Sequence, residues 1–138
     1  MSAGVDKVLV VHADLAVCRL ARESLETFCE CQVETTSVAL GAFERALQKD
    51  FKLVLLDLNL ETLPGPLLHD LICRALQVCA PTRPLPAVMY FCEASEVARR
   101  DDLLRDARVK GLLTLPLNIE RLLEKVRGIL PLKRSPFE

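Results

Sequence analysis

A short apolar run, Leu53-Val54-Leu55-Leu56, leads directly into the carboxylate of Asp57 and narrows the choice of folds more than any other stretch. Four consecutive apolar residues between polar ones are typical of a strand that is buried on both faces, as in a parallel sheet. Asp57 then lies at the carboxyl end of that strand, at the edge where open α/β sheets bind ligands. A second interpretation, in which Asp57 only opens a turn or caps a helix, remains open at this point.

Strand-like segments alternate with helical patterns along the whole chain. The predicted strands are Lys7–Val11, Gln32–Thr36, Leu53–Leu56, Ala87–Phe91 and Gly111–Leu115. The predicted helices are Leu15–Cys29 after an Asp14 cap, a segment capped by Ser37, a segment from Pro66 onward, a charged segment from Ser95 to Arg108, and a segment from Asn118 to Ile129. This alternation predicts an α/β fold with a flavodoxin-like, doubly wound five-stranded parallel sheet, five helices and the strand order 2-1-3-4-5. The same order brings the residues that follow the first, third, fourth and fifth strands to one edge of the sheet.

The composition is that of a single globular domain. Of 138 residues, 51% are hydrophobic and 27% are charged, and the net charge of −1 gives no sign of a nucleic-acid-binding surface. We expect a domain over residues 1–130, followed by a polar tail or the start of a linker over 131–138. No apolar run is long enough to span a bilayer and the first residues do not resemble a signal peptide, so we expect a cytoplasmic protein with six reduced cysteines.

With this order of elements, nearly the whole chain resembles a response-regulator receiver domain. The resemblance depends on a few residues at the expected places, namely Asp57, Asn59 two residues later, Gly65, Lys110-Gly111 before the fifth strand and Pro116 after it. It implies a signalling domain of a two-component or phosphorelay pathway. Asp57 is then the equivalent of the aspartate that the family phosphorylates.

The other residues that the family uses for phosphoryl transfer differ in this chain. The family holds Mg²⁺ with two acidic residues after the first strand, and contacts the phosphoryl group with a hydroxyl after the fourth strand and a lysine after the fifth. Here these positions hold His12 and Ala13, Phe91, and Leu115, while Asp14 is acidic but one place late. Because neutralisation of charge does most of the work in phosphoryl transfer, losing all these groups together removes most of the stabilisation of a transferred phosphoryl group.

The chain is therefore predicted to be a pseudo-receiver, which keeps the fold, binds protein partners, is not an enzyme and needs no cofactor. The alternative is a working response regulator that a histidine kinase phosphorylates on Asp57, with Mg²⁺ at Asp14, Asp57 and Asn59. A small enzyme or cofactor binder of the same fold, such as a flavin-binding protein, is disfavoured. The loop after the first strand has no glycine- and hydroxyl-rich phosphate-binding motif, and no Ser/His/Asp set is apparent at the sheet edge. An interaction domain without any regulated state also remains open.

His12 has a possible role of its own in this cleft. If the first and third strands are neighbours, an imidazolium at His12 could replace the missing metal as the counter-charge to Asp57. The other possibility is that His12 turns outward into solvent. Phe91 and Leu115 are expected to fill the space left by the missing lysine, with an apolar ligand site as the second interpretation.

The resemblance also implies a partner-binding face, made by the fourth helix, the fifth strand and the last helix. Its members here would be Glu96, Arg99, Arg100, Asp101, Arg105, Leu112, Arg121 and Lys125. Ion pairs are expected at helical spacing between Glu96 and both Arg99 and Arg100, and between Asp101 and Arg105. The partner could be a histidine kinase or an attached output domain, and a homodimer could use the same face; neither nucleic acid nor a membrane is expected as a partner.

Overall fold

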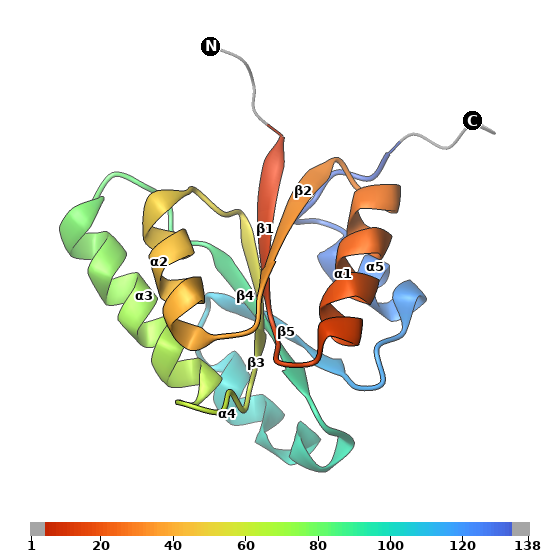
Figure 1. Ribbon diagram of the computed structural model, residues 1–138. Helices are drawn as coiled ribbons and strands as arrows, with labels where there is room; N and C mark the ends of the chain where they lie inside the picture. Colours follow the sequence, from red (N-terminus) through yellow and green to blue (C-terminus); the bar gives the residue numbers. More distant parts are fainter. Residues whose placement is uncertain (1–4, 134–138) are drawn as a thin grey trace.

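Five parallel strands form the centre of the molecule in the computed structural model, which describes residues 5–133 (Figure 1). The strands are β1 (Asp6–Val11), β2 (Cys31–Thr36), β3 (Leu53–Asp57), β4 (Ala87–Cys92) and β5 (Val109–Thr114). Their order in the sheet is β2-β1-β3-β4-β5. The flavodoxin-like, doubly wound sheet predicted from the sequence is therefore confirmed, including the pairing of the first strand with the third.

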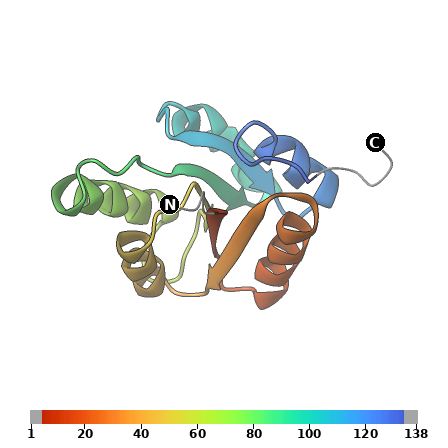
Figure 2. The same cartoon turned by 90° about the horizontal axis from the view of Figure 1, so that it is seen from above.

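Helices cover both faces of this sheet (Figure 2). α1 (Leu15–Phe28) and α5 (Ile119–Val126) pack on one face, and α2 (Ala39–Gln48) and α3 (Gly65–Cys79) pack on the other. A 3₁₀ helix, η1 (Ala94–Arg99), leads into the short helix α4 (Arg100–Leu104). No helix within residues 5–133 is both long and apolar enough to cross a bilayer.

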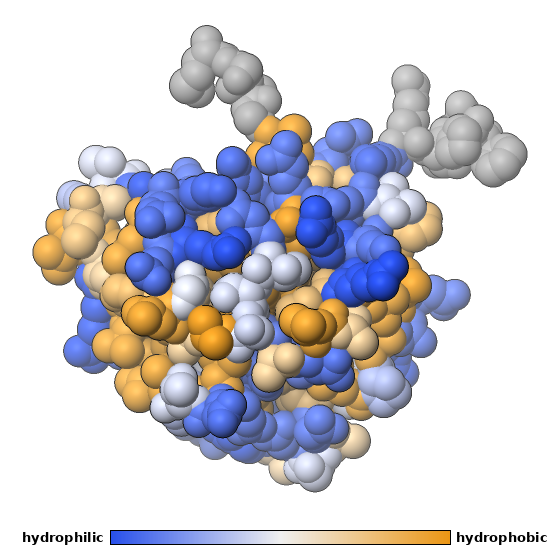
Figure 3. All heavy atoms as spheres, viewed as in Figure 1, coloured by the Kyte–Doolittle hydropathy of each residue, from blue (hydrophilic) through white to orange (hydrophobic). Residues whose placement is uncertain are grey.

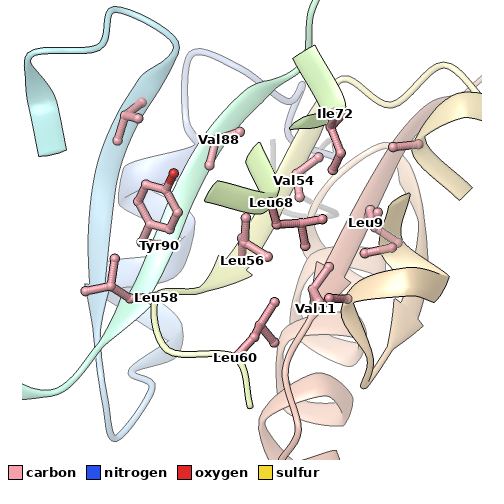
Figure 4. Packing of buried hydrophobic residues seen from close by; sticks show 14 of the residues in the cluster. Leu9, Val11, Val54, Leu56, Leu58, Leu60, Leu68, Ile72, Val88 and Tyr90 are labelled. Atoms are coloured by element: carbon pink, nitrogen blue, oxygen red, sulfur yellow. The ribbon is translucent and has the colours of Figure 1, made fainter. Parts of the chain in front are cut away.

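The sheet is buried on both faces, which explains the unbroken apolar runs of its central strands. Side chains alternate between the faces, so Val8 and Val10 of β1 pack toward α1 while Leu9 and Val11 pack toward α2. Figure 4 shows the second of these layers, where Leu68 of α3 meets the side chains of the sheet. Each fully buried side chain of this size stabilises the fold by about 1.5–3 kcal/mol.

The segment predicted as one charged helix from Ser95 to Arg108 is instead split into η1 and α4. η1 has no buried residue and α4 buries only Leu103, so no apolar stripe supports a long helix there. Its amino-terminal cap is also not Ser95. The Glu93 side chain accepts a hydrogen bond from the Glu96 backbone N–H, and the Glu96 side chain accepts one from the Glu93 backbone N–H, which forms a capping box.

Other element boundaries differ from the sequence-based prediction by a few residues. Val38, and not Ser37, precedes α2, without a side-chain hydrogen bond. α5 ends at Val126, three residues before the predicted end, and Gly128 then adopts a φ of 121° that favours glycine.

The described chain continues past residue 130, where the domain was predicted to end. Leu130 is buried, Leu132 forms an antiparallel bridge with Cys29, and the Lys133 amide donates to the Phe28 carbonyl at 2.9 Å. The remainder of the predicted tail, residues 134–138, lies outside the described residues. Both ends of the described chain lie at the amino ends of the strands (Figure 1).

Candidate functional site

A cleft of about 250 Å³ opens at the carboxyl ends of the strands. The two ends of the described chain lie at the opposite edge of the sheet, where the strands begin (Figure 1). Segments that are distant in sequence contribute to it because parallel strands all end at this edge. The lining residues are His12, Asp57, Asn59, Phe91, Cys92, Glu93, Glu96 and Leu115. The topology therefore brings five of the seven predicted pocket residues together: His12, Asp57, Asn59, Phe91 and Leu115.

Asp57 is held at the end of β3 by a tightly folded loop. The Asn59 amide donates to Asp57 Oδ1 at 3.0 Å, and the Leu58 amide donates to the Phe91 carbonyl at 3.0 Å. The Gly65 amide donates a hydrogen bond to the Leu58 carbonyl at 2.9 Å. A Cβ atom at residue 65 would overlap the Asp57 carbonyl oxygen. Glycine at this place therefore allows the start of α3 to lie directly against the residue that carries the carboxylate.

His12 points into the cleft and lies against Asp57. Its Nε2 is 3.6 Å from Asp57 Oδ2, and the residue is 8% exposed, so it is not solvated in the outward orientation. Its other ring nitrogen, Nδ1, accepts a hydrogen bond from the Asp14 amide at 2.9 Å. A nitrogen that accepts a hydrogen bond carries no proton, so the ring is the neutral tautomer with its proton on Nε2, facing Asp57. The counter-charge expected from an imidazolium is thus replaced by a polar N–H group.

Ala13 and Asp14 do not line the cleft. The Asp14 carboxylate accepts a hydrogen bond from the Ala16 amide at 2.9 Å, which makes it the amino-terminal cap of α1, as the sequence predicted. The loop after β1 therefore supplies an imidazole to the cleft in place of acidic groups.

Phe91 and Leu115 give the cleft an apolar wall. Phe91 is fully buried, and its ring meets the His12 ring edge-on, with 5.4 Å between the centroids and 87° between the planes. Leu115 packs against the core layer beneath α1 and α5. The Leu115–Pro116 peptide bond is cis. Phe91 and Leu115 occupy the region where the resemblance implied a hydroxyl and a lysine. The contacts of Phe91 with His12, and of Leu115 with the core layer, are packing contacts.

Two carboxylates in the cleft, Glu93 and Glu96, were missed by the sequence-based prediction. Glu96 accepts a hydrogen bond from the Asn59 side-chain amide and another from the Glu93 amide at 2.9 Å. The hydrogen bond from Asn59, and next the one from the Glu93 amide, lower the pKa of Glu96, so its carboxylate is ionised at neutral pH. The predicted pairing of Glu96 with Arg99 and Arg100 is therefore wrong, because its carboxylate turns toward the cleft. The sequence could have revealed Glu93 as a cleft residue, because it directly follows β4 at the same edge of the sheet where Asp57 ends β3.

The side chains in this cleft do not fit the Mg²⁺ that the resemblance implied. Of the three proposed ligands, Asp14 caps α1, Asn59 donates to Glu96, and Asp57 faces the Nε2–H of His12. Within residues 5–133, no three histidine, cysteine, aspartate or glutamate side chains are placed to hold a metal ion.

The predicted partner face contains a shallow groove of about 190 Å³ between η1, β5 and α5. Arg100, Leu112, Arg121 and Lys125 line it, together with apolar residues such as Val97, whereas Arg99 and Arg105 do not. Arg105 pairs with Asp102 at 3.4 Å in solvent, and not with Asp101 as predicted. The groove is thus basic at its rim and apolar at its floor.

Comparison with known proteins places the fold but gives no match in sequence. No protein-family model and no curated protein matches the chain. Among solved structures, the chain is similar to the signal receiver domain of a putative Luxo repressor protein from Vibrio parahaemolyticus, with a TM-score of 0.75 and 18% identity over 89% of this chain and 88% of that one. It is also similar to the chemotaxis response regulator CheY4 of Vibrio cholerae, with a TM-score of 0.72 and 20% identity over 92% of this chain and all of the other. A two-component response regulator from Clostridium difficile matches at a TM-score of 0.68 and 19% identity, over 90% and 94% of the two chains. The chain therefore has the fold of response-regulator receiver domains.

Proposed function

We propose that this chain is a receiver-like signalling domain of the two-component type that works as a pseudo-receiver. It binds protein partners in the cytoplasm and is not switched by Mg²⁺-dependent phosphorylation of Asp57. The observation that carries this proposal is the contact of His12 Nε2 with Asp57 at 3.6 Å, in a cleft whose back wall is Phe91.

The charge of the cleft supports the proposal. Asp57, Glu93 and Glu96 contribute three carboxylates, and no lysine or arginine lines the cleft in the described part of the chain. A phosphoryl group would bring further negative charge into this environment without a cation to neutralise it. Each missing electrostatic contact typically costs about 10²-fold or more in the rate of such a reaction.

Phosphorylation can be tested directly by NMR. Addition of Mg²⁺ with acetyl phosphate or beryllofluoride is expected to leave the amide signals of Asp57, Asn59 and Glu93 unchanged. A matched variant, His12→Asp combined with Leu115→Lys, restores an acid and the cation and is expected to respond more strongly than the natural chain. Clear shifts in the natural chain that disappear in Asp57→Asn would contradict the proposal.

A working response regulator is the second candidate, because Asp57 is 16% exposed in its side chain and faces an open cleft. Incubation with a phosphorylated histidine kinase distinguishes the two candidates. Transfer of one phosphoryl group to the natural chain, absent in Asp57→Asn by intact-mass measurement, would replace the pseudo-receiver with this alternative.

The basic groove indicates what kind of partner the domain binds. Arg100, Arg121 and Lys125 surround an apolar floor, and no acidic side chain lines the groove among residues 5–133. It therefore suits a partner segment with acidic residues beside an apolar anchor, as a kinase or an output domain could present. Charge reversal by Arg121→Glu is expected to weaken binding of such a segment at least tenfold by calorimetry, and unchanged binding would argue against the groove.

A further inference from the structure

The helix α3 is apolar on two sides, which is unusual for a helix at the surface. Its inner side packs Leu68, Ile72 and Leu76 against the sheet, and Figure 4 labels the first two. Its outer side repeats apolar residues at helical spacing, namely Leu67, Leu71, Ala75 and Val78. Leu67 and Leu71 are well exposed and Val78 is 82% exposed. A helix needs only one apolar stripe to pack on a sheet, so the second stripe calls for another surface to cover it.

The neighbouring helix α2 continues this apolar surface. Leu40 is 68% exposed, and Val38 just before the helix is also exposed. Between the two helices lies a groove of about 580 Å³, lined by Val38, Leu40, Phe43, Leu63, Leu68 and Leu71 among others. No charged side chain lines it in the part of the chain that the structure describes. Figure 3 shows hydrophobic side chains gathered over this side of the molecule.

We propose that the α2–α3 surface, defined as α2, α3 and the groove between them, is the interface of a homodimer. The patch carries both protruding side chains, such as Leu40, and a groove that can receive them. A two-fold interface uses the same patch on both copies and requires this combination, because each copy must offer what the other accepts.

The size and charge of the patch fit a second copy of this chain. Five apolar residues of the patch, Val38, Leu40, Leu67, Leu71 and Val78, are each 42–82% exposed, which is an unusually large apolar surface for a monomer. A second copy would cover these side chains within a standard interface, to which each partner contributes roughly 800 Å². The net charge of −1 means that two copies do not repel each other strongly. Asp70 and Arg74, on the exposed side of α3, pair with each other at 2.9 Å, so a second copy would meet a neutral ion pair there.

The oligomeric state of the full chain tests this proposal. Sedimentation velocity over a wide concentration range is expected to show a monomer–dimer equilibrium for the natural chain. Leu71→Glu and Leu40→Glu are each expected to raise the dimer dissociation constant by about 100-fold or more, because each charge enters the interface twice. The matched control is Leu15→Glu, since Leu15 is 72% exposed but lies at the start of α1, and its dissociation constant is expected to stay unchanged.

Circular dichroism and thermal unfolding show whether each variant keeps the fold. If Leu71→Glu does not fold, Leu40→Glu tests the same interface. A natural chain that stays monomeric at every concentration would overturn the proposal and leave the patch to a different partner. A dimer that persists in both α2–α3 variants and dissociates with Arg121→Glu would also overturn it, by placing the interface at the basic groove. The proposal does not depend on whether Asp57 is phosphorylated.

Discussion

His12 and Asp57 form the contact that sets the chemistry of the cleft. The Asp14 amide holds Nδ1 of His12 as an acceptor, and this turns the Nε2–H group toward the carboxylate. An acidic residue at position 12 would add a charge to the cleft, whereas a neutral imidazole adds a donor and blocks one side of Asp57. The two residues thus form a polar pair at 3.6 Å, and the Asp57 carboxylate still faces the cleft.

The tautomer of His12 is open to direct measurement. Nitrogen-15 NMR at neutral pH is expected to show a protonated Nε2 and an unprotonated Nδ1, because the Asp14 amide donates to Nδ1. Asp57→Asn is expected to move the Nε2 signal and to leave the Nδ1 signal in place. Protonation at Nδ1 in the neutral ring would contradict the geometry described for this loop.

Gly65 is the residue whose replacement is expected to disturb the cleft most. Gly65→Ala places a methyl group against the Asp57 carbonyl oxygen, so the loop or the start of α3 must shift, at an expected cost of about 1–3 kcal/mol in the free energy of unfolding. Gly111→Ala is the matched control, because its methyl group would meet only the Lys125 side chain, at 3.5 Å. Urea denaturation measures both, and equal stabilities would show that the loop yields without cost.

At the scale of elements, the strands and the strand order followed directly from the sequence. Leu53–Leu56 and Val8–Val11 are apolar at every position, which is typical of short strands buried on both faces. η1 and α4 could not be predicted in the same way. Their charges repeat at helical spacing, but a helix in this position also needs buried contacts, and only Leu103 supplies one.

The candidate site was predictable in part for a related reason. Strand order places residues at an edge, so the meeting of His12 with Asp57 could be anticipated from the sequence. The direction of a side chain on an irregular segment could not, because it depends on local hydrogen bonds. Glu96 turns toward Asn59 through a hydrogen bond that no periodicity encodes, whereas the hydrogen bond of Asp14 to the Ala16 amide was predicted as the cap of a helix.

The contact of α3 with β4 carries a buried histidine that links stability to pH. His69 is 3% exposed, its Nδ1 lies 3.3 Å from the Tyr90 hydroxyl, and its Nε2 has no partner among the described residues. Burial, and then the positive charge of Arg108, lower the pKa of His69 below 6.5. Below that pH the unfolded chain binds a proton that the folded chain does not, so stability present above pH 6.5 is lost as the pH falls through the folded-state pKa.

Urea denaturation between about pH 7 and about pH 5 checks this link. The natural chain is expected to lose stability more steeply than His69→Gln, which has no titrating ring. Tyr90→Phe keeps the histidine and is expected to keep the steeper slope. Parallel curves for the natural chain and His69→Gln would show that His69 takes up its proton equally well in the folded and unfolded chains.

At the scale of the whole molecule, the reactivity of the cysteine thiols shows how completely the helices on both faces of the sheet exclude solvent from the core. Five of the six cysteines are buried and Cys79, at the end of α3, is exposed. Burial raises the pKa of the buried thiols, that of Cys31 to about 12, so they are both inaccessible and protonated. A thiol reagent is therefore expected to label one cysteine rapidly in the native protein and six in denaturant, and Cys79→Ser is expected to abolish the rapid phase. Rapid labelling of further cysteines would mean that a helix layer opens readily.

The two ends of the described chain have a practical consequence for studying this protein. Val5 precedes β1 and Lys133 bonds to Phe28 at the end of α1, so both lie at the amino ends of the strands, whereas Asp57 ends β3. A strand of six residues such as β1 spans roughly 20 Å. A fluorophore, a biosensor chip or an affinity handle joined at either of these residues would leave the cleft at the carboxyl ends of the strands unobstructed. The same tethered preparation could then report on acyl phosphate, on peptides and on a second copy in turn.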